Sequence, residues 1–186
     1  MRILGISGSL RHGSYNTKLL HAVEELLPAG VEFELYDELE EVPPYNEDRD
    51  TDDSPAAAVR LRDAIAHADA VLFATPEYNG SVPGQLKNAV DWASRPHRIS
   101  ALWGKPVAVV GASTGMFGAV WAQAELRKVL KTAGARVVET EVAVAKADSR
   151  FDEDGTLIDE EIREQLVETV ELLLAEAHAA PRLVAA

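Results

Sequence analysis

The sequence contains no cysteine, so disulfides, thiolate metal sites and cysteine nucleophiles are excluded. It also lacks any run of roughly 18 apolar residues, the length that a membrane-spanning helix needs. Residues 1–10 carry one arginine and a short, glycine-broken apolar run, which is too weak a pattern for a signal peptide. These absences suit a reducing compartment, and we expect a cytoplasmic protein.

Basic residues are scarce. The 186 residues include 18 Lys and Arg against 31 Asp and Glu, which gives a net charge of −13. Nucleic acids and anionic membranes bind basic surfaces, so we expect neither as the main partner. An anionic small molecule would need a locally positive pocket in this acidic chain. The length and the 47% hydrophobic content fit one globular domain spanning residues 1–186.

Apolar runs and amphipathic segments alternate along the chain. We expect strands at residues 2–6, 31–36, 70–75, 106–111 and 137–144, and helices at 17–27, 55–67, 84–94, 119–133 and 159–179. Ser54 is the expected N-cap of the second helix, and Gly134 is expected to end the fourth. The acidic segment 37–54 is expected to be an exposed loop with no assigned role, and the tail after Pro181 to be frayed.

Strict alternation of strands and helices predicts an α/β protein whose parallel sheet is covered by helices on both faces. Five strands suit the flavodoxin-like doubly wound order 2-1-3-4-5. Ligands of such sheets bind beyond the carboxyl ends of the strands, at the point where the strand order reverses. In this order the loops after the first and third strands flank that point, and these loops carry the unusual sequences.

The loop after the first strand, residues 8–16 (GSLRHGSYN), joins a strand to the start of a helix. Free N–H groups and the positive end of the helix dipole favour a phosphate in such a loop. Its serines and Asn16 add hydrogen-bonding side chains, and Arg11 adds positive charge. Ser and Asn are also ordinary N-cap residues, so the alternative is that part of the loop only caps the helix.

Two more loops follow neighbouring strands. Residues 75–84 (TPEYNGSVPG) contain two prolines and two glycines, which over-specify a rigid backbone. Such a loop can bind the polar edge of a flat heterocycle, with Tyr78 as an aromatic wall. Alternatively, it is a tight turn with a core tyrosine. Residues 111–118 (GASTGMFG) weakly resemble a dinucleotide-binding fingerprint and place a third small, polar loop at the same edge.

Residues 8–16 and the longer segment 76–92 (PEYNGSVPGQLKNAVDW) resemble the two signatures of the NADPH-dependent FMN reductase family, which includes flavodoxin-like quinone, azo-dye and chromate reductases. The resemblance covers roughly residues 2–175. It implies non-covalently bound FMN held by residues of all three loops: Ser9, Arg11, Ser14, Tyr15 and Asn16 around the phosphate, Pro76, Glu77, Tyr78, Asn79 and Gly80 at the isoalloxazine, and Ser113 and Gly115 closing the pocket.

The resemblance also implies an activity. Family members transfer hydride from NADPH or NADH to the flavin and pass electrons to a quinone, nitro, azo or metal-oxyanion acceptor. They are commonly homodimers or homotetramers whose subunits meet around the active site. The flavin performs the hydride transfer itself, so neither a catalytic residue nor a metal site is expected. Two alternatives remain: a flavodoxin-type FMN electron carrier without NAD(P)H turnover, and a non-catalytic phosphate- or nucleotide-binding module.

One further motif imitates a metal site. Residues 150–161 resemble an EF-hand calcium loop, but its first ligand position is occupied by Arg150. A cation at that position argues against calcium binding. We expect a surface turn before the last helix.

Overall fold

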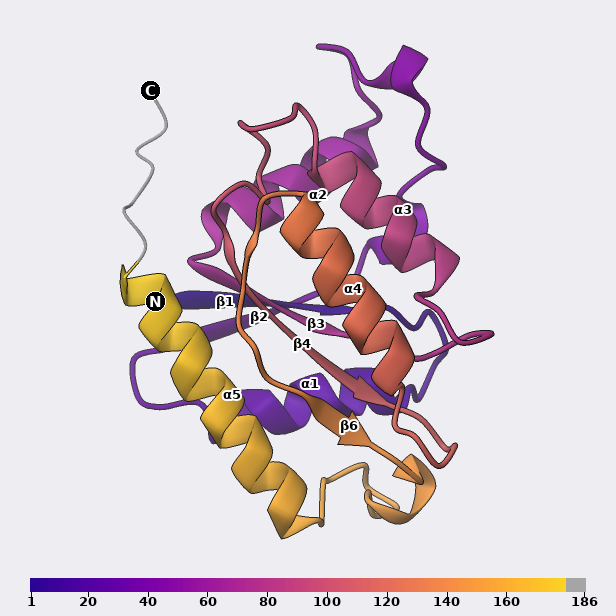
Figure 1. Ribbon diagram of the computed structural model, residues 1–186, viewed down its shortest axis with the longest axis vertical. Coiled ribbons are helices and arrows are strands. Elements are labelled where there is room, and N and C mark those ends of the chain that lie inside the picture. The colour runs from indigo at the N-terminus through magenta and orange to yellow at the C-terminus, as the bar shows by residue number, and fades with distance from the viewer. Residues whose placement is uncertain (180–186) are drawn as a thin grey trace.

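The computed structural model describes residues 1–179 as a parallel β-sheet with helices on both faces (Figure 1). The strands are β1 (Arg2–Ser7), β2 (Glu32–Tyr36), β3 (Ala70–Ala74), β4 (Pro106–Ala112), β5 (Arg136–Val137) and β6 (Val142–Val144). They follow the order β2-β1-β3-β4-β5, with β6 also paired to β4, and each of these pairings is parallel. The expected doubly wound order is confirmed, and the strand order reverses between β1 and β3.

Helices cover both faces of the sheet. They are α1 (Tyr15–Leu26), α2 (Ala56–His67), α3 (Gly84–Ala93), α4 (Val120–Thr132) and α5 (Glu160–Ala179). α1 and α5 lie against one face, and α2, α3 and α4 lie against the other (Figure 1). Successive strand residues enter opposite cores: Leu72 packs in the core with α1 and α5, whereas Val71 and Phe73 pack with α2 to α4. This two-sided burial follows from the two-residue period of a strand.

The central strands β3 and β4 are buried along their whole length, as their continuous apolar sequences predict. At the sheet edge, β2 has exposed residues alternating with half-buried ones. The loops that follow β1, β3 and β4 therefore start from a rigid frame that is covered on both faces.

The expected continuous strand at 137–144 is wrong, because the chain leaves the sheet between β5 and β6. β5 pairs with the start of β4 through Val137 and Val107, whereas β6 pairs with its end through Val142 and Val110. From Val137 to Val142 the chain advances by five residues, whereas the partner stretch of β4, from Val107 to Val110, advances by only three. The surplus residues bulge outward.

Charged side chains on α4 fix this bulge. The Arg127 guanidinium donates to the carbonyl oxygen of Thr140 at 3.1 Å and pairs with Glu141 at 3.1 Å. One helical turn later, Lys131 pairs with Glu139. The alternation of apolar and polar residues that suggested one strand is the product of these outward-facing glutamates.

The entry to α2 also differs from expectation. Pro55 occupies the N-cap position, and Ser54 instead donates its hydroxyl to the carbonyl oxygen of Thr51 at 2.7 Å, so Ser54 is not the cap. At the end of α4, Gly134 has a φ of 90° and ends the helix as expected.

The acidic segment 37–54 is only partly exposed. It contains two short 3-10 helices, η1 (Leu39–Glu41) and η2 (Glu47–Arg49), and both Leu39 and Val42 are buried in the core beside α2 and α3. The expected fraying after Pro181 lies outside the described residues. Within residues 1–179, no helix is both long enough and apolar enough to cross a membrane.

Candidate functional site

The loops after β1, β3 and β4 lie together at the carboxyl edge of the sheet, as predicted, because these strands are neighbours. Backbone hydrogen bonds join the loop origins. Gly8 N–H donates to the carbonyl oxygen of Ala74 at 2.8 Å, and Thr75 N–H donates to that of Val110 at 2.9 Å. A Cβ atom on Gly8 would lie 2.7 Å from the Leu86 side chain, so the first loop passes close to α3 at this glycine.

The first loop ends in the N-cap of α1. The Ser14 hydroxyl accepts a hydrogen bond from Asn16 N–H at 3.2 Å, and α1 therefore starts at Tyr15, two residues earlier than expected. Gly13 has a φ of 68°, which residues with side chains rarely adopt. The capping alternative is thus confirmed for Ser14.

Capping leaves most donors of this loop free. Within residues 1–179, no hydrogen bond is formed by the backbone N–H groups of Leu10, Arg11, His12, Gly13 and Tyr15. Free N–H groups beside the start of a helix form a ready site for an anion, because the helix dipole adds positive potential there. The loop therefore suits a phosphate group in addition to its role as a cap.

Positive charge gathers beside these donors. The Arg11 guanidinium and the Lys18 ammonium lie over the Tyr15 ring, 5.9 and 5.3 Å from its centre. Lys146 adjoins the third loop, since its backbone N–H donates to the Gly115 carbonyl oxygen at 3.0 Å. None of these three cations pairs with a carboxylate of the described residues. Arg11 and Lys18 thus place two positive charges beside Tyr15, the first residue of α1, in an otherwise acidic chain.

The second loop folds into a tight turn. Tyr78 and Ser81 exchange two backbone hydrogen bonds, of 3.1 and 3.2 Å, across Asn79 and Gly80. The φ angles of the two central residues, 55° and 73°, are typical of a type I′ turn, which favours Asn-Gly. The Tyr78 side chain is 53% exposed, so the alternative of a core tyrosine is wrong. The N–H groups of Asn79 and Gly80 form no hydrogen bond within the described part of the chain.

Side chains fasten this turn to α4. Glu77 Oε2 accepts hydrogen bonds from the backbone N–H groups of Trp121 and Ala122, each at 3.1 Å. One turn further along α4, Glu125 accepts a hydrogen bond from the Ser81 hydroxyl at 2.6 Å. The predicted Glu77 is therefore at the site, with its carboxylate directed at the helix.

The third loop closes on itself and on β6. Ser113 Oγ accepts a hydrogen bond from Gly115 N–H at 3.1 Å, and Ser113 N–H donates to the Val144 carbonyl oxygen at 3.0 Å. Gly118 has a φ of 56°, and a Cβ atom there would lie 2.4 Å from the carbonyl carbon of Ala143. This glycine is therefore explained by close packing against β6.

The remaining predicted residues lie deeper. Asn16 is buried, and its amide bonds to the backbone of Ala112, the last residue of β4. Ser9 is half-buried and its N–H donates to Ser7 Oγ at 3.4 Å, while Pro76 is buried at the start of the second loop. The structure thus brings all the predicted site residues to one edge of the sheet, where some fix the loops and others present free polar groups.

Large apolar side chains are exposed around the same edge. We call them the edge patch, and they come from the three loops and the start of α4: Leu10, Tyr78, Met116, Phe117 and Trp121. The Phe117 and Trp121 rings lie 4.8 Å apart. Neighbouring exposed aromatic rings such as these are typical of an interaction surface.

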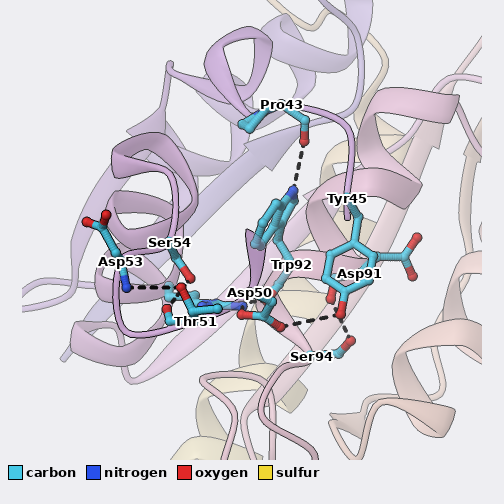
Figure 2. Close-up of polar contacts among 10 residues, drawn as sticks. Pro43, Tyr45, Asp50, Thr51, Asp53, Ser54, Asp91, Trp92 and Ser94 are labelled. Carbon is cyan, nitrogen blue, oxygen red and sulfur yellow. Dashed lines mark hydrogen bonds and ion pairs between the residues drawn. The ribbon is translucent and has the colours of Figure 1, made fainter. Parts of the chain in front are cut away.

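Helix α3 holds the acidic segment 37–54, an arrangement that no pattern in the sequence indicated. Trp92 is fully buried, and its indole N–H donates to the carbonyl oxygen of Pro43 at 2.7 Å (Figure 2). Asn88 Oδ1 accepts the Tyr45 N–H at 2.7 Å, and Asn88 Nδ2 donates to Pro43 at 2.9 Å. Both α3 residues belong to the 76–92 signature, so its second half anchors a neighbouring loop.

An ion pair completes this anchor. Arg62 of α2 pairs with Asp50 at 2.7 Å, and the two side chains are only 18% and 14% exposed. The guanidinium also donates to the Trp92 carbonyl oxygen at 2.9 Å and lies 5.4 Å from the centre of the indole ring. The Tyr45 hydroxyl reaches Asp50 at 3.4 Å (Figure 2). The segment after β2 is consequently an ordered part of the same sheet edge.

Residues 150–161 form the expected surface turn. Asp152 Oδ1 accepts the Thr156 N–H at 2.8 Å, and Phe151 and Leu157 form a single antiparallel bridge. Across residues 1–179, no three His, Asp or Glu side chains lie close enough together to hold a metal ion.

A doubly wound sheet whose switch point carries a donor-rich loop with two cations and a rigid turn defines a flavodoxin-like protein suited to a phosphorylated cofactor. The family model described as NADPH-dependent FMN reductase matches residues 1–149. The chain belongs to this family, as its two signatures suggested.

Relatives agree with this assignment. An NAD(P)H-dependent FMN reductase of Pseudomonas aeruginosa is 45% identical over 174 residues, which are 93% of either chain. A 2-hydroxy-1,4-benzoquinone reductase of a Burkholderia species is 40% identical over 89% of this chain and 90% of its own. Among solved structures, the flavoenzyme NAD(P)H:(acceptor) oxidoreductase FerB of Paracoccus denitrificans superposes with a TM-score of 0.83 at 36% identity, over 96% of this chain and 98% of that one.

The chain is accordingly an FMN-dependent NAD(P)H oxidoreductase. The expectations of fold, family and enzyme class are confirmed. The comparisons give no support to the alternative of a flavodoxin-type electron carrier.

Proposed function

We propose that the first loop binds the phosphate of FMN. The observation that carries this proposal is the coincidence of free backbone N–H groups with Arg11 and Lys18, two cations that have no carboxylate partner among the described residues. Both features stabilise a phosphate dianion. The side chains of Ser9, Ser14 and Tyr15 would complete the site, and Asn16 would fix the loop that surrounds it.

The second and third loops would hold the isoalloxazine, the second through residues 76–80 and the third through Ser113 and Gly115. FMN supplies the hydride chemistry when bound, and the protein binds and orients it. The free N–H groups of Asn79 and Gly80 are suited to the polar edge of the ring. Such dipoles stabilise the electron-rich reduced flavin, because they oppose its negative charge.

The proposed reaction is oxidation of NADPH or NADH coupled to reduction of a small quinone. Two relatives that are named for quinone reduction, at 40% and 43% identity, support this acceptor class. Azo and nitro compounds and metal oxyanions belong to the same proposal, since choice among acceptors depends on the shape of the pocket above the ring.

The edge patch supports a homo-oligomer, either a homodimer or a homotetramer. A second copy of the chain would cover exposed rings such as Phe117 and Trp121 and narrow the entrance to the site. We also propose that the enzyme works in the cytoplasm, where NADPH and NADH are present and the absence of cysteine suits a reducing environment.

Steady-state turnover tests the proposed function. The purified protein is reconstituted with FMN and assayed for NADPH and NADH oxidation with and without 1,4-benzoquinone. We expect oxidation that depends on both FMN and the quinone. A protein that retains FMN but does not oxidise either nucleotide would be a carrier. A protein that stays colourless after reconstitution would be a phosphate-binding module without flavin.

A further inference from the structure

Helix α4 begins without a cap of its own. Its N-cap residue is Ala119, which has a φ of 62° and no side-chain acceptor to offer. The first N–H groups of a helix have no partner within the helix and need acceptors from elsewhere. α4 starts directly after the third loop, so whatever satisfies these donors also determines where that loop ends.

Glu77 of the second loop supplies the missing acceptor. Its Oε2 atom accepts hydrogen bonds from the N–H groups of Trp121 and Ala122, each at 3.1 Å, across 44 and 45 residues of sequence. A carboxylate is the favourable group at this position, because it opposes the positive end of the helix dipole. One side chain thus connects the proposed flavin-binding turn to the helix that follows the third loop.

The first turn of α4 also holds the third loop through a buried side chain. Gln123 is fully buried, and its Nε2 donates to the carbonyl oxygen of Gly118 at 3.1 Å. A Cβ atom on Gly111 would lie 2.8 Å from the Thr75 carbonyl oxygen and 2.9 Å from Gln123 Nε2. The first turn of α4 is therefore packed against the origins of both loops, with little room for either to shift.

We propose that Glu77 is a positioning residue for the flavin: its carboxylate, bound to the start of α4, sets the second and third loops at the spacing that FMN binding requires. This inference rests on the proposed FMN site. In this proposal the side chain of Glu77 binds the start of α4, and the backbone of residues 76–80 contacts the flavin ring.

Three variants test the role. Glu77→Ala removes both hydrogen bonds, and we expect its Kd for FMN to rise at least about tenfold. Glu77→Gln keeps an oxygen that can accept both N–H groups, and its Kd should stay within about threefold of the wild-type value. The matched control is Glu168→Ala, which removes an exposed carboxylate from α5, on the other face of the sheet, and it too should stay within about threefold.

Hydrogen exchange in the flavin-free protein tests the link without the cofactor. The Trp121 and Ala122 amides should exchange at least about tenfold faster in Glu77→Ala than in the wild type. In Glu168→Ala the same two amides should exchange at the wild-type rate. Should Glu77→Ala fail to fold, Glu77→Asp replaces it, because the shorter side chain keeps the charge but loses the reach. The same tenfold effects are expected of it.

The proposal is overturned if the folded Glu77→Ala or Glu77→Asp protein binds FMN with wild-type affinity, if Glu77→Gln loses as much affinity as Glu77→Ala, or if the two amides exchange at the wild-type rate. A wild-type protein that binds no FMN would contradict the proposed function instead. The exchange measurement would then still decide whether Glu77 orders the start of α4.

Discussion

Asn16 and Ala112 are separated by 96 residues of sequence, yet they exchange two hydrogen bonds. Asn16 Nδ2 donates to the Ala112 carbonyl oxygen at 3.0 Å, and the Ala112 N–H donates to Asn16 Oδ1 at 2.9 Å. Both residues are buried. The pair fixes the start of α1 against the end of β4, and so it fixes the first loop relative to the third.

Asn16→Asp should disrupt this pair. A carboxylate oxygen replaces the Nδ2 donor and would face the Ala112 carbonyl oxygen. The hydrogen bond from Ala112 N–H to Oδ1 remains. We expect the free energy of unfolding to fall by about 2 kcal/mol and FMN affinity to fall at least about tenfold. Urea unfolding and FMN titration measure these effects.

The control is Asn46→Asp, since Asn46 is exposed and an aspartate retains the acceptor for Asp48 N–H. Equal behaviour of the two variants would contradict the account.

Arg11→Ala should weaken FMN retention without affecting the fold. Arg11 is exposed and pairs with no carboxylate of the described residues, so its charge is available to a phosphate. A charge-assisted contact of this kind is worth about tenfold in affinity, and salt should reduce the difference between variant and wild type. FMN titrations at low and high ionic strength provide the measurement.

The control for this experiment is Arg49→Ala, which removes another exposed arginine, on the acidic segment. Its affinity for FMN should match the wild type at both ionic strengths. Unchanged affinity in Arg11→Ala would remove Arg11 from the phosphate site.

The sequence predicted the sheet well because its signals are local. The buried strands are continuous apolar runs, and each helix shows its own periodicity, so the order of elements and the doubly wound topology followed. The exception, residues 137–144, arose because the pairing of Glu139 and Glu141 with α4 is a tertiary interaction that imitates strand alternation.

The site was predicted as a set of loops, but the roles within it were not. Ser9 to Asn16 and residues 76–80 could be placed at the switch point from motif and topology alone. That Glu77 caps α4, that Asn16 binds Ala112, and that Asn88 and Trp92 hold the acidic segment depend on contacts between residues more than 40 positions apart. No periodicity or spacing signals such contacts.

Asn88→Ala should loosen the acidic segment. The substitution removes the acceptor of the Tyr45 N–H and the donor to Pro43. We expect the Tyr45 amide to exchange at least about tenfold faster and the free energy of unfolding to fall by about 1–3 kcal/mol. Hydrogen exchange and urea unfolding measure the two effects. Lys87→Ala is the control, because Lys87 pairs with Asp91 of the same helix and, within residues 1–179, with no carboxylate of the acidic segment. Unaltered exchange at Tyr45 in Asn88→Ala would show that the anchor lies elsewhere.

Because of Tyr36, the free energy of unfolding should fall as the pH rises from about 10 to about 12. Burial, with a further contribution from the Glu38 carboxylate, raises the pKa of Tyr36 from 10.0 to about 12. Between these values the unfolded chain releases a proton that the folded chain retains. The stabilisation is therefore fully present below pH 10 and is lost as the pH rises toward 12.

Tyr36→Phe should abolish this dependence. The variant should lose about 2 kcal/mol less stability than the wild type between pH 10 and pH 12. At neutral pH it should be as stable as the wild type or more stable by about 1 kcal/mol, since the Tyr36 hydroxyl is buried with no hydrogen-bond partner among the described residues. Urea unfolding over this pH range measures both effects. An identical alkaline loss in the two proteins would assign the dependence to other groups.

The most direct test of the central claim is the visible absorption spectrum of the FMN-reconstituted protein, recorded under anaerobic conditions before and after one equivalent of NADPH. We expect a flavin band that bleaches on addition of NADPH and returns when 1,4-benzoquinone is added. A protein without a flavin band after reconstitution, or a band that NADPH leaves unchanged, would contradict it.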